Sequence, residues 1–129
     1  MGHKIHPKSV RIGYIKDWDS KWFNLKEMPD FVEEDFRIRR YLKDKLKSAS
    51  VSKIGIERAG KYIRVNIYTS RPGIVIGKGG QGMESLRMEV EQMTQRKAFV
   101  NVMEIKKPET DAQLCSDNIA YQLERQIAF

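Results

Sequence analysis

The chain has 129 residues, which suits one domain large enough to bury a core without disulfides. Its single cysteine excludes an intramolecular disulfide and fits a reducing compartment, and 40% apolar residues argue against a disordered chain. No apolar run is long enough to span a membrane, so no membrane partner is expected.

The positive charge is concentrated in the first eighty residues. Residues 1–80 carry eighteen basic and nine acidic side chains, whereas residues 81–129 carry six basic and eight acidic ones. One basic cluster lies within residues 4–16, which contain no acid, and a second spans residues 53–78. This asymmetry indicates a polyanionic partner, and nucleic acid is the first candidate for it. Binding through phosphates would weaken as the salt concentration rises.

Residues 1–29 show no helical or alternating periodicity and are expected to form an extended basic arm. For its aromatic residues Trp18, Trp22 and Phe23, packing against the domain is favoured over stacking on bases. A helix is then predicted to begin at Asp30, an N-cap type of residue followed by Glu33 at the N3 position of a capping box. The apolar residues at helical spacing, which should face the core, are Ile38, Tyr41, Leu42, Leu46 and Ala49.

Two alternating segments follow and predict a short antiparallel hairpin. Ile54 and Ile56 alternate with polar residues, a turn falls at Ala59-Gly60, and residues 62–68 alternate again. A third strand is predicted at residues 98–106. A last helix is predicted to start at residues 108–111, with its inner face formed by Ala112, Cys115, Ile119, Leu123 and Ile127. The expected fold class is α+β, with helices packed on one face of a three-stranded mixed sheet.

A glycine-rich segment, Gly77-Lys78-Gly79-Gly80-Gln81-Gly82, lies between a short apolar run at residues 74–76 and a helix marked by Met83, Leu86, Val90 and Met93. The run is either a strand or one helical turn. A nucleotide-triphosphate loop requires four residues between its first glycine and Gly-Lys, then Ser or Thr, and the segment meets neither requirement. Gly77, Gly79 and Gly82 fit the dinucleotide pattern G-x-G-x-x-G, but the chain is too short for two mononucleotide-binding halves.

The third interpretation of this segment is a G-x-x-G loop formed by Gly77, Lys78, Gly79 and Gly80. Glycines let the backbone come close to a sugar-phosphate chain, and the following helix directs N–H groups and a positive dipole end at phosphates. Lys78 adds a charge at the tip. A loop of this kind clamps four backbone nucleotides in a KH domain.

Catalysis and metal binding are not expected. The two histidines, His3 and His6, lie in the arm, where no third metal ligand accompanies them and no nucleophile, base and orienting acid can be assembled. We therefore predict no catalytic residues, no metal ligands and no cofactors.

Residues 71–78, Arg-Pro-Gly-Ile-Val-Ile-Gly-Lys, are similar to the type II KH signature of the third protein of the bacterial small ribosomal subunit, and two further motifs resemble the same family. The arm matches through Met1-Gly2-x-Lys4-x-His6-Pro7, Arg11-x-Gly13 and Trp18-x-Ser20-x-Trp22-Phe23. The last helix matches through Lys107-Pro108-Glu109-x-Asp111-Ala112 and Gln122-Leu123-Glu124-Arg125, so the resemblance covers essentially the whole chain in order.

The resemblance implies a non-enzymatic, structural RNA-binding protein of the cytoplasmic ribosome, in the head of the small subunit. It would contact ribosomal RNA beside the channel through which messenger RNA enters, next to other head proteins. Residues 1–29 would be the arm and residues 30–129 a type II KH domain with a terminal helix. The expected RNA-binding residues are Lys4, His6, Arg11 and Lys16 of the arm, Arg64 and Arg71 of the second basic cluster, and Gly77, Lys78, Gly79 and Gly80 of the loop.

The sequence departs from the family at Ser9, where glycine is usual, and at Gln126, where a second arginine is usual. The family normally continues beyond the position of Phe129 into a second domain, which is expected to be absent here. Two alternatives remain open at this stage: a KH module of a ribosome assembly factor, and a nucleotide-binding enzyme.

Overall fold

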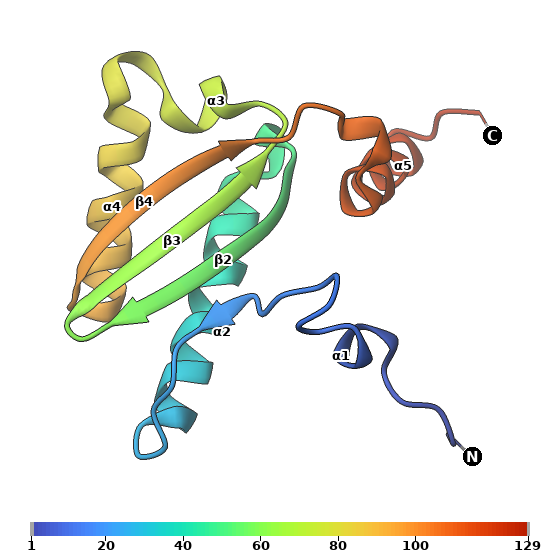
Figure 1. Cartoon of the computed structure of the whole chain (residues 1–129). Coiled ribbons are helices and arrows are strands. Elements are labelled where there is room, and N and C mark those ends of the chain that lie inside the picture. Colours follow the sequence, from blue (N-terminus) through green and yellow to red (C-terminus); the bar gives the residue numbers. More distant parts are fainter. Residues whose placement is uncertain (1, 129) are drawn as a thin grey trace.

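The computed structural model describes residues 2–128, so Met1 and Phe129 lie outside the described residues. Helices cover one face of a sheet whose three long strands lie in front of them in Figure 1. The elements in chain order are α1 (Pro7–Val10), β1 (Ser20–Lys21), α2 (Met28–Lys45), η1 (Lys47–Ala49), β2 (Val51–Ala59), β3 (Tyr62–Thr69), α3 (Pro72–Ile76), η2 (Lys78–Gly80), α4 (Gln81–Thr94), β4 (Lys97–Glu104), η3 (Pro108–Thr110) and α5 (Ala112–Glu124).

The sheet has the order β1-β2-β3-β4 and mixed pairing. Strands β2 and β3 form the predicted antiparallel hairpin, while β3 pairs with β4, and β1 with β2, in parallel. The predicted α+β fold is confirmed, with four strands rather than three. The additional strand lies in the predicted arm, where the backbone carbonyl of Asp19 accepts a hydrogen bond from the Ile56 N–H at 2.8 Å. Two residues are too few to show the alternation by which a strand is recognised in a sequence.

The core lies between the sheet and helices α2 and α4. Ile38 and Leu42 of α2, and Leu86 and Val90 of α4, are buried against the inward-facing residues of β2, β3 and β4. The prediction that Tyr41 faces the core was wrong, because Tyr41 is exposed; Met93 of α4 is exposed as well. Helix α2 also begins before Asp30, at Met28, because the Asn24 side chain accepts hydrogen bonds from the Lys26 and Glu27 N–H groups and reverses the chain there. Within residues 2–128, no helix combines the length and apolarity needed to cross a bilayer.

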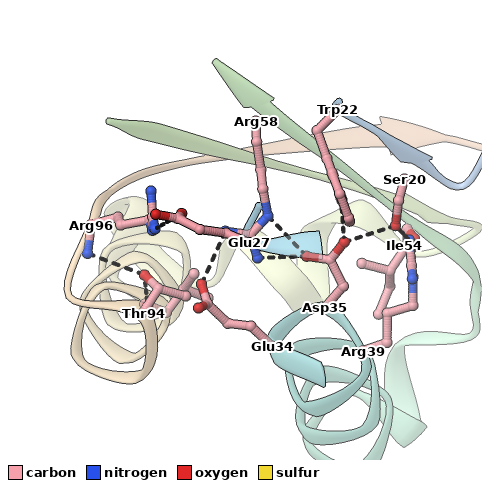
Figure 2. A network of polar contacts seen from close by, with 11 residues as sticks. Ser20, Trp22, Glu27, Glu34, Asp35, Arg39, Ile54, Arg58, Thr94 and Arg96 are labelled. Carbon is pink, nitrogen blue, oxygen red and sulfur yellow. Dashed lines mark hydrogen bonds and ion pairs between the residues drawn. The ribbon is translucent and has the colours of Figure 1, made fainter. Parts of the chain in front are cut away.

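A buried ion-pair network fixes the end of the arm to the domain (Figure 2). The Asp35 carboxylate of α2 accepts two hydrogen bonds from Arg58 of β2, at 2.6 and 3.2 Å. It also accepts one from the Ser20 hydroxyl at 2.9 Å and one from the Trp22 indole at 2.7 Å. The Trp22 ring packs edge-on against Phe31, with 5.3 Å between the ring centroids. The prediction that arm aromatics pack on the domain is therefore met by Trp22, whereas Trp18 and Phe23 are exposed.

The last helix does not have the predicted inner face. Leu114 is its one buried residue among those described, while Ile119 and Leu123 are 59% and 54% exposed, and Cys115 is exposed as well. Helix α5 starts from the Asp111 carboxylate, which caps it and accepts from the Ser52 hydroxyl of β2 at 2.8 Å. Beyond this attachment the helix projects away from the sheet in Figure 1, so its apolar spacing meets no surface of the described chain.

A polar contact joins α2 to α4 and predicts a dependence of stability on pH. The Glu89 carboxylate accepts from the Lys45 ammonium and the Tyr41 hydroxyl, and these contacts hold the pKa of Glu89 below its ordinary value of 4.5. Because the pKa is lower in the folded state, the contribution of Glu89 is complete above pH 4.5 and is lost as the pH falls through the folded-state pKa.

We therefore expect Glu89→Gln to lower the urea midpoint of unfolding at neutral pH, and the difference from wild type to shrink in acid. Urea titrations across the acidic range measure it, with Glu124→Gln as a control at an exposed carboxylate without an ion pair in the described chain. A difference that stays constant down to the lowest pH would contradict the assignment.

Candidate nucleic-acid interface

The glycine segment forms an exposed loop between two helices. The apolar run at residues 74–76 is helical, as part of α3, which resolves the two possibilities that the sequence left open. The chain then turns through Gly77, Gly79 and Gly80, whose φ angles are 71°, 61° and 76°. All three lie in the left-handed region, where residues with a Cβ atom are strained. The glycines are therefore required by the path of the backbone from α3 into α4.

Gly82 has a different role from that of a turn residue. It lies in the first turn of α4, and a Cβ atom at this position would come within 2.5 Å of the Val75 carbonyl oxygen and 2.9 Å of the Ile76 carbonyl oxygen. No real Cβ atom approaches a backbone oxygen so closely. Gly82 thus allows the start of α4 to lie directly against the end of α3, and this contact fixes the geometry of the loop.

The loop and the start of the helix after it have features that favour the binding of an anion. No side chain caps the start of α4, which has Gly80 as its N-cap residue, and Lys78 is exposed at the loop tip. The amino end of this fourteen-residue helix carries the positive end of its dipole. Ile74 is 51% exposed beside the loop, whereas Val65 of β3 is fully buried in the core.

The arm residues lie apart from the glycine loop. Figure 1 places α1 and α3 on opposite sides of the molecule. His6 caps α1 by accepting a hydrogen bond from the Lys8 N–H at 3.3 Å, and Arg11 donates to the Pro7 carbonyl oxygen at 3.1 Å. Lys4 and Lys16 are exposed. The structure therefore does not bring the two sets of predicted RNA-binding residues into one site.

The second basic cluster is also divided by the fold. Arg71 is exposed beside α3, at the loop end of the domain, and Arg64 is exposed on the outer face of the sheet, 3.5 Å from Glu57. Arg58 belongs to the same cluster in sequence, but its side chain is buried against Asp35 and Phe31. Residue spacing could have indicated this difference, because Arg58 is in phase with the inward-facing Ile54 and Ile56.

Among residues 2–128, no three His, Cys, Asp or Glu side chains are grouped closely enough to hold a metal ion.

Residues 37–110 match the KH domain family. The matched range contains both strands of the hairpin, the glycine loop and β4. The chain belongs to the KH domain family. The expected fold is thereby confirmed on sequence comparison as well as on topology, and the loop Gly77–Gly80 lies within the matched residues.

Curated relatives extend the similarity to the whole chain. The chain is 78% identical over 129 residues to small ribosomal subunit protein uS3 of Endomicrobium trichonymphae, covering 100% of this chain and 56% of the relative. It is 54% identical over 125 residues to the protein of that name from Elusimicrobium minutum, covering 97% and 52%, and 52% identical over 129 residues to that from Myxococcus xanthus, covering 100% and 59%. The resemblance to the third small-subunit protein is confirmed, and the chain spans about half the length of these relatives.

Proposed function

We propose that the chain is a non-catalytic RNA-binding part of the small ribosomal subunit in the cytoplasm. The ribosomal assignment is supported by the relatives, which are named small ribosomal subunit proteins. The RNA-binding assignment depends on one observation: the exposed loop Gly77–Gly80 precedes an uncapped helix start and carries Lys78 at its tip. Main-chain amides and the helix dipole at this point suit the phosphates of a nucleotide strand.

The arm supplies a second, electrostatic contribution to the proposal. Lys4, Arg11 and Lys16 form no ion pair within residues 2–128, so their charges are available to phosphates. His6, the N-cap residue of α1, lies between Lys4 and Arg11 along the arm. In the assembled subunit the arm would contact ribosomal RNA, and the domain would lie in the head beside the channel through which messenger RNA enters, in contact with neighbouring head proteins. Arg64 and Arg71 complete the proposed RNA-binding set.

The test is a charge reversal in the loop. The double substitution Lys78→Asp and Gly79→Asp is expected to raise the Kd of the chain for a short single-stranded RNA by about tenfold or more, since it replaces a phosphate ligand with two negative charges. Asp is among the residues that best tolerate the left-handed conformation of position 79, so the variant should fold. Fluorescence anisotropy of a labelled oligoribonucleotide at fixed salt concentration measures the Kd.

The matched control is Lys43→Asp with Gln92→Asp, which changes the net charge equally at exposed positions on α2 and α4. We expect this control to bind RNA more tightly than the loop variant. Equal affinities of the loop variant and wild type would show that the loop is not the RNA clamp.

A further inference from the structure

The outer face of the sheet has no covering element in the described chain. Helices α2 and α4 lie behind the three long strands in Figure 1, and within residues 2–128 no segment crosses the front of β3 and β4. The strand register shows which side chains point outward. They are Lys53, Gly55, Glu57 and Ala59 of β2, Tyr62, Arg64, Asn66 and Tyr68 of β3, and Lys97, Phe99, Asn101 and Met103 of β4. We call these residues the outer sheet face.

Aromatic rings on this face are exposed and lie close together. Tyr62 and Phe99 are 50% and 42% exposed, and their ring centroids lie 5.8 Å apart on the adjacent strands β3 and β4. They occupy diagonal positions in the register, because Tyr62 is opposite Lys97, and Phe99 is opposite Arg64. A further ring, that of Tyr68, lies near the other end of β3. The two ring planes are inclined by 46°, so together they offer two adjacent stacking surfaces on neighbouring strands, which we call the platform.

A lysine ammonium group lies near the Tyr62–Phe99 pair and another lies near the Tyr68 ring. The Lys97 ammonium lies 5.9 Å from the Tyr62 ring centroid and 5.7 Å from that of Phe99. The Lys53 ammonium lies 4.8 Å from the Tyr68 ring centroid. With Arg64, the outer sheet face carries three cations against one acid, Glu57. The excess of positive charge on an aromatic face favours an anionic, aromatic ligand.

A hollow with basic walls adjoins the aromatic pair. It lies where β3 begins and α4 ends, and its lining residues are Lys61, Tyr62, Thr94, Gln95, Arg96 and Lys97. Three of these carry positive charge, and Lys61 forms no ion pair in the described part of the chain. A phosphate in this hollow would be near the edge of the Tyr62 ring. Tyr62 belongs to both the aromatic pair and the lining of the hollow, so the two features are contiguous.

We propose that the outer sheet face is a second binding surface for single-stranded RNA, separate from the glycine loop. Bases stack on Tyr62 and Phe99, Lys97 contacts the backbone beside them, and the hollow at Lys61 and Arg96 holds a neighbouring phosphate. The hollow and the adjoining Tyr62 ring lie at the carboxyl end of α4 and the glycine loop at its amino end, and the fourteen residues of the helix separate them by about 21 Å. A strand of RNA held at both would be fixed along the domain rather than at one point.

The composition of the face favours RNA over a protein partner. Lysine is depleted from the centres of protein–protein interfaces, because its ammonium group loses hydration there. On the outer sheet face a lysine lies next to each group of rings, and the exposed Asn101 amide, which donates to Asn66 at 3.3 Å, adds polar groups between them. Rings interleaved with cations are the pattern by which proteins hold unpaired nucleotides.

The experiment compares four forms of the chain: wild type, the loop variant Lys78→Asp with Gly79→Asp, the sheet variant Tyr62→Thr with Phe99→Thr, and the combination. Threonine retains β-propensity on the exposed strands, so the sheet variant should fold. We expect the sheet variant to raise the Kd for a short mixed-sequence single-stranded RNA about tenfold, both in the wild-type and in the loop-variant background. The control Phe36→Ala removes an exposed ring of α2 and should leave the Kd unchanged.

The design separates this proposal from the proposed function. If the loop variant loses RNA affinity and the sheet variant does not, the second surface is overturned and the glycine loop remains the binding site. If the sheet variant loses RNA affinity and the loop variant does not, the second surface alone is retained. Amide resonances of β3 and β4 that shift when RNA is added to the loop variant support the proposal, and shifts confined to other elements overturn it. The proposal would also be overturned if the chain dimerised in a concentration-dependent way and the sheet substitutions abolished the dimer without changing RNA affinity. The outer sheet face would then be an interface with a second copy of the chain.

Discussion

Substitution of Asp35 by alanine is expected to lower the free energy of unfolding by about 3–5 kcal/mol, the largest loss of stability predicted for this chain. Asp35 is 2% exposed, and the Arg58 side chain beside it is 4% exposed. Removing the carboxylate leaves the Arg58 guanidinium buried with Glu34, 3.1 Å away, as its remaining ion-pair partner. The Trp22 indole and the Ser20 hydroxyl lose their acceptor as well. Urea denaturation followed by circular dichroism measures the change.

The same substitution should release the end of the arm. Trp22 is held by its hydrogen bond to Asp35 and by the Phe31 ring, so the loss of the carboxylate is expected to expose the indole and shift its fluorescence to longer wavelength. The double variant Asp35→Leu with Arg58→Met should recover much of the stability, since it removes the unpaired charge together with its partner.

The control for this prediction is Glu33→Ala, which removes the carboxylate from an exposed pair with Arg37 on the same helix. An exposed pair of this kind contributes about 0–1 kcal/mol. If Asp35→Ala cost no more than Glu33→Ala, the buried network would not be a determinant of stability.

Gly82→Ala is the second large expected effect, because a methyl group at this position has no space. The new Cβ atom would approach the Val75 and Ile76 carbonyl oxygens at 2.5 and 2.9 Å, so α3 and α4 must separate. Overpacking of this kind costs typically about 1–3 kcal/mol, and here the obstructing atoms are backbone. The displacement changes the loop that the two helices hold. We expect a lower urea midpoint together with weaker binding of single-stranded RNA.

Gly73→Ala is the matched control for Gly82→Ala. Gly73 is also helical, it lies in α3, and a Cβ atom there would meet nothing within 4 Å. Alanine at this position should leave stability unchanged or raise it by about 0.5–1 kcal/mol, since it restricts the unfolded chain. Equal stability and RNA affinity of the two alanine variants would show that the close contact at Gly82 does not hold the loop.

Local patterns in the sequence determined most of the secondary structure. The alternation at residues 62–68 predicted β3, the short turn predicted its antiparallel pairing with β2, and the glycine cluster predicted a loop at the start of α4. These features depend on residues within a few positions of one another, so the local sequence is enough to predict them. The motifs at both ends of the chain also indicated the family, which the relatives then confirmed.

Only the tertiary structure decided which charged residues are available to a ligand. Asp35 continues the spacing of the buried stripe through Phe31 and Ile38, and Arg58 is in phase with the buried Ile54 and Ile56. Two charged side chains can occupy these buried positions because the fold pairs Asp35 with Arg58. The spacing of apolar residues in α5 predicted a buried face, yet burial requires a surface to pack against, and the helix points away from the sheet. A sequence specifies local periodicity, whereas pairing across 23 residues and the presence of an opposing surface are properties of the folded chain.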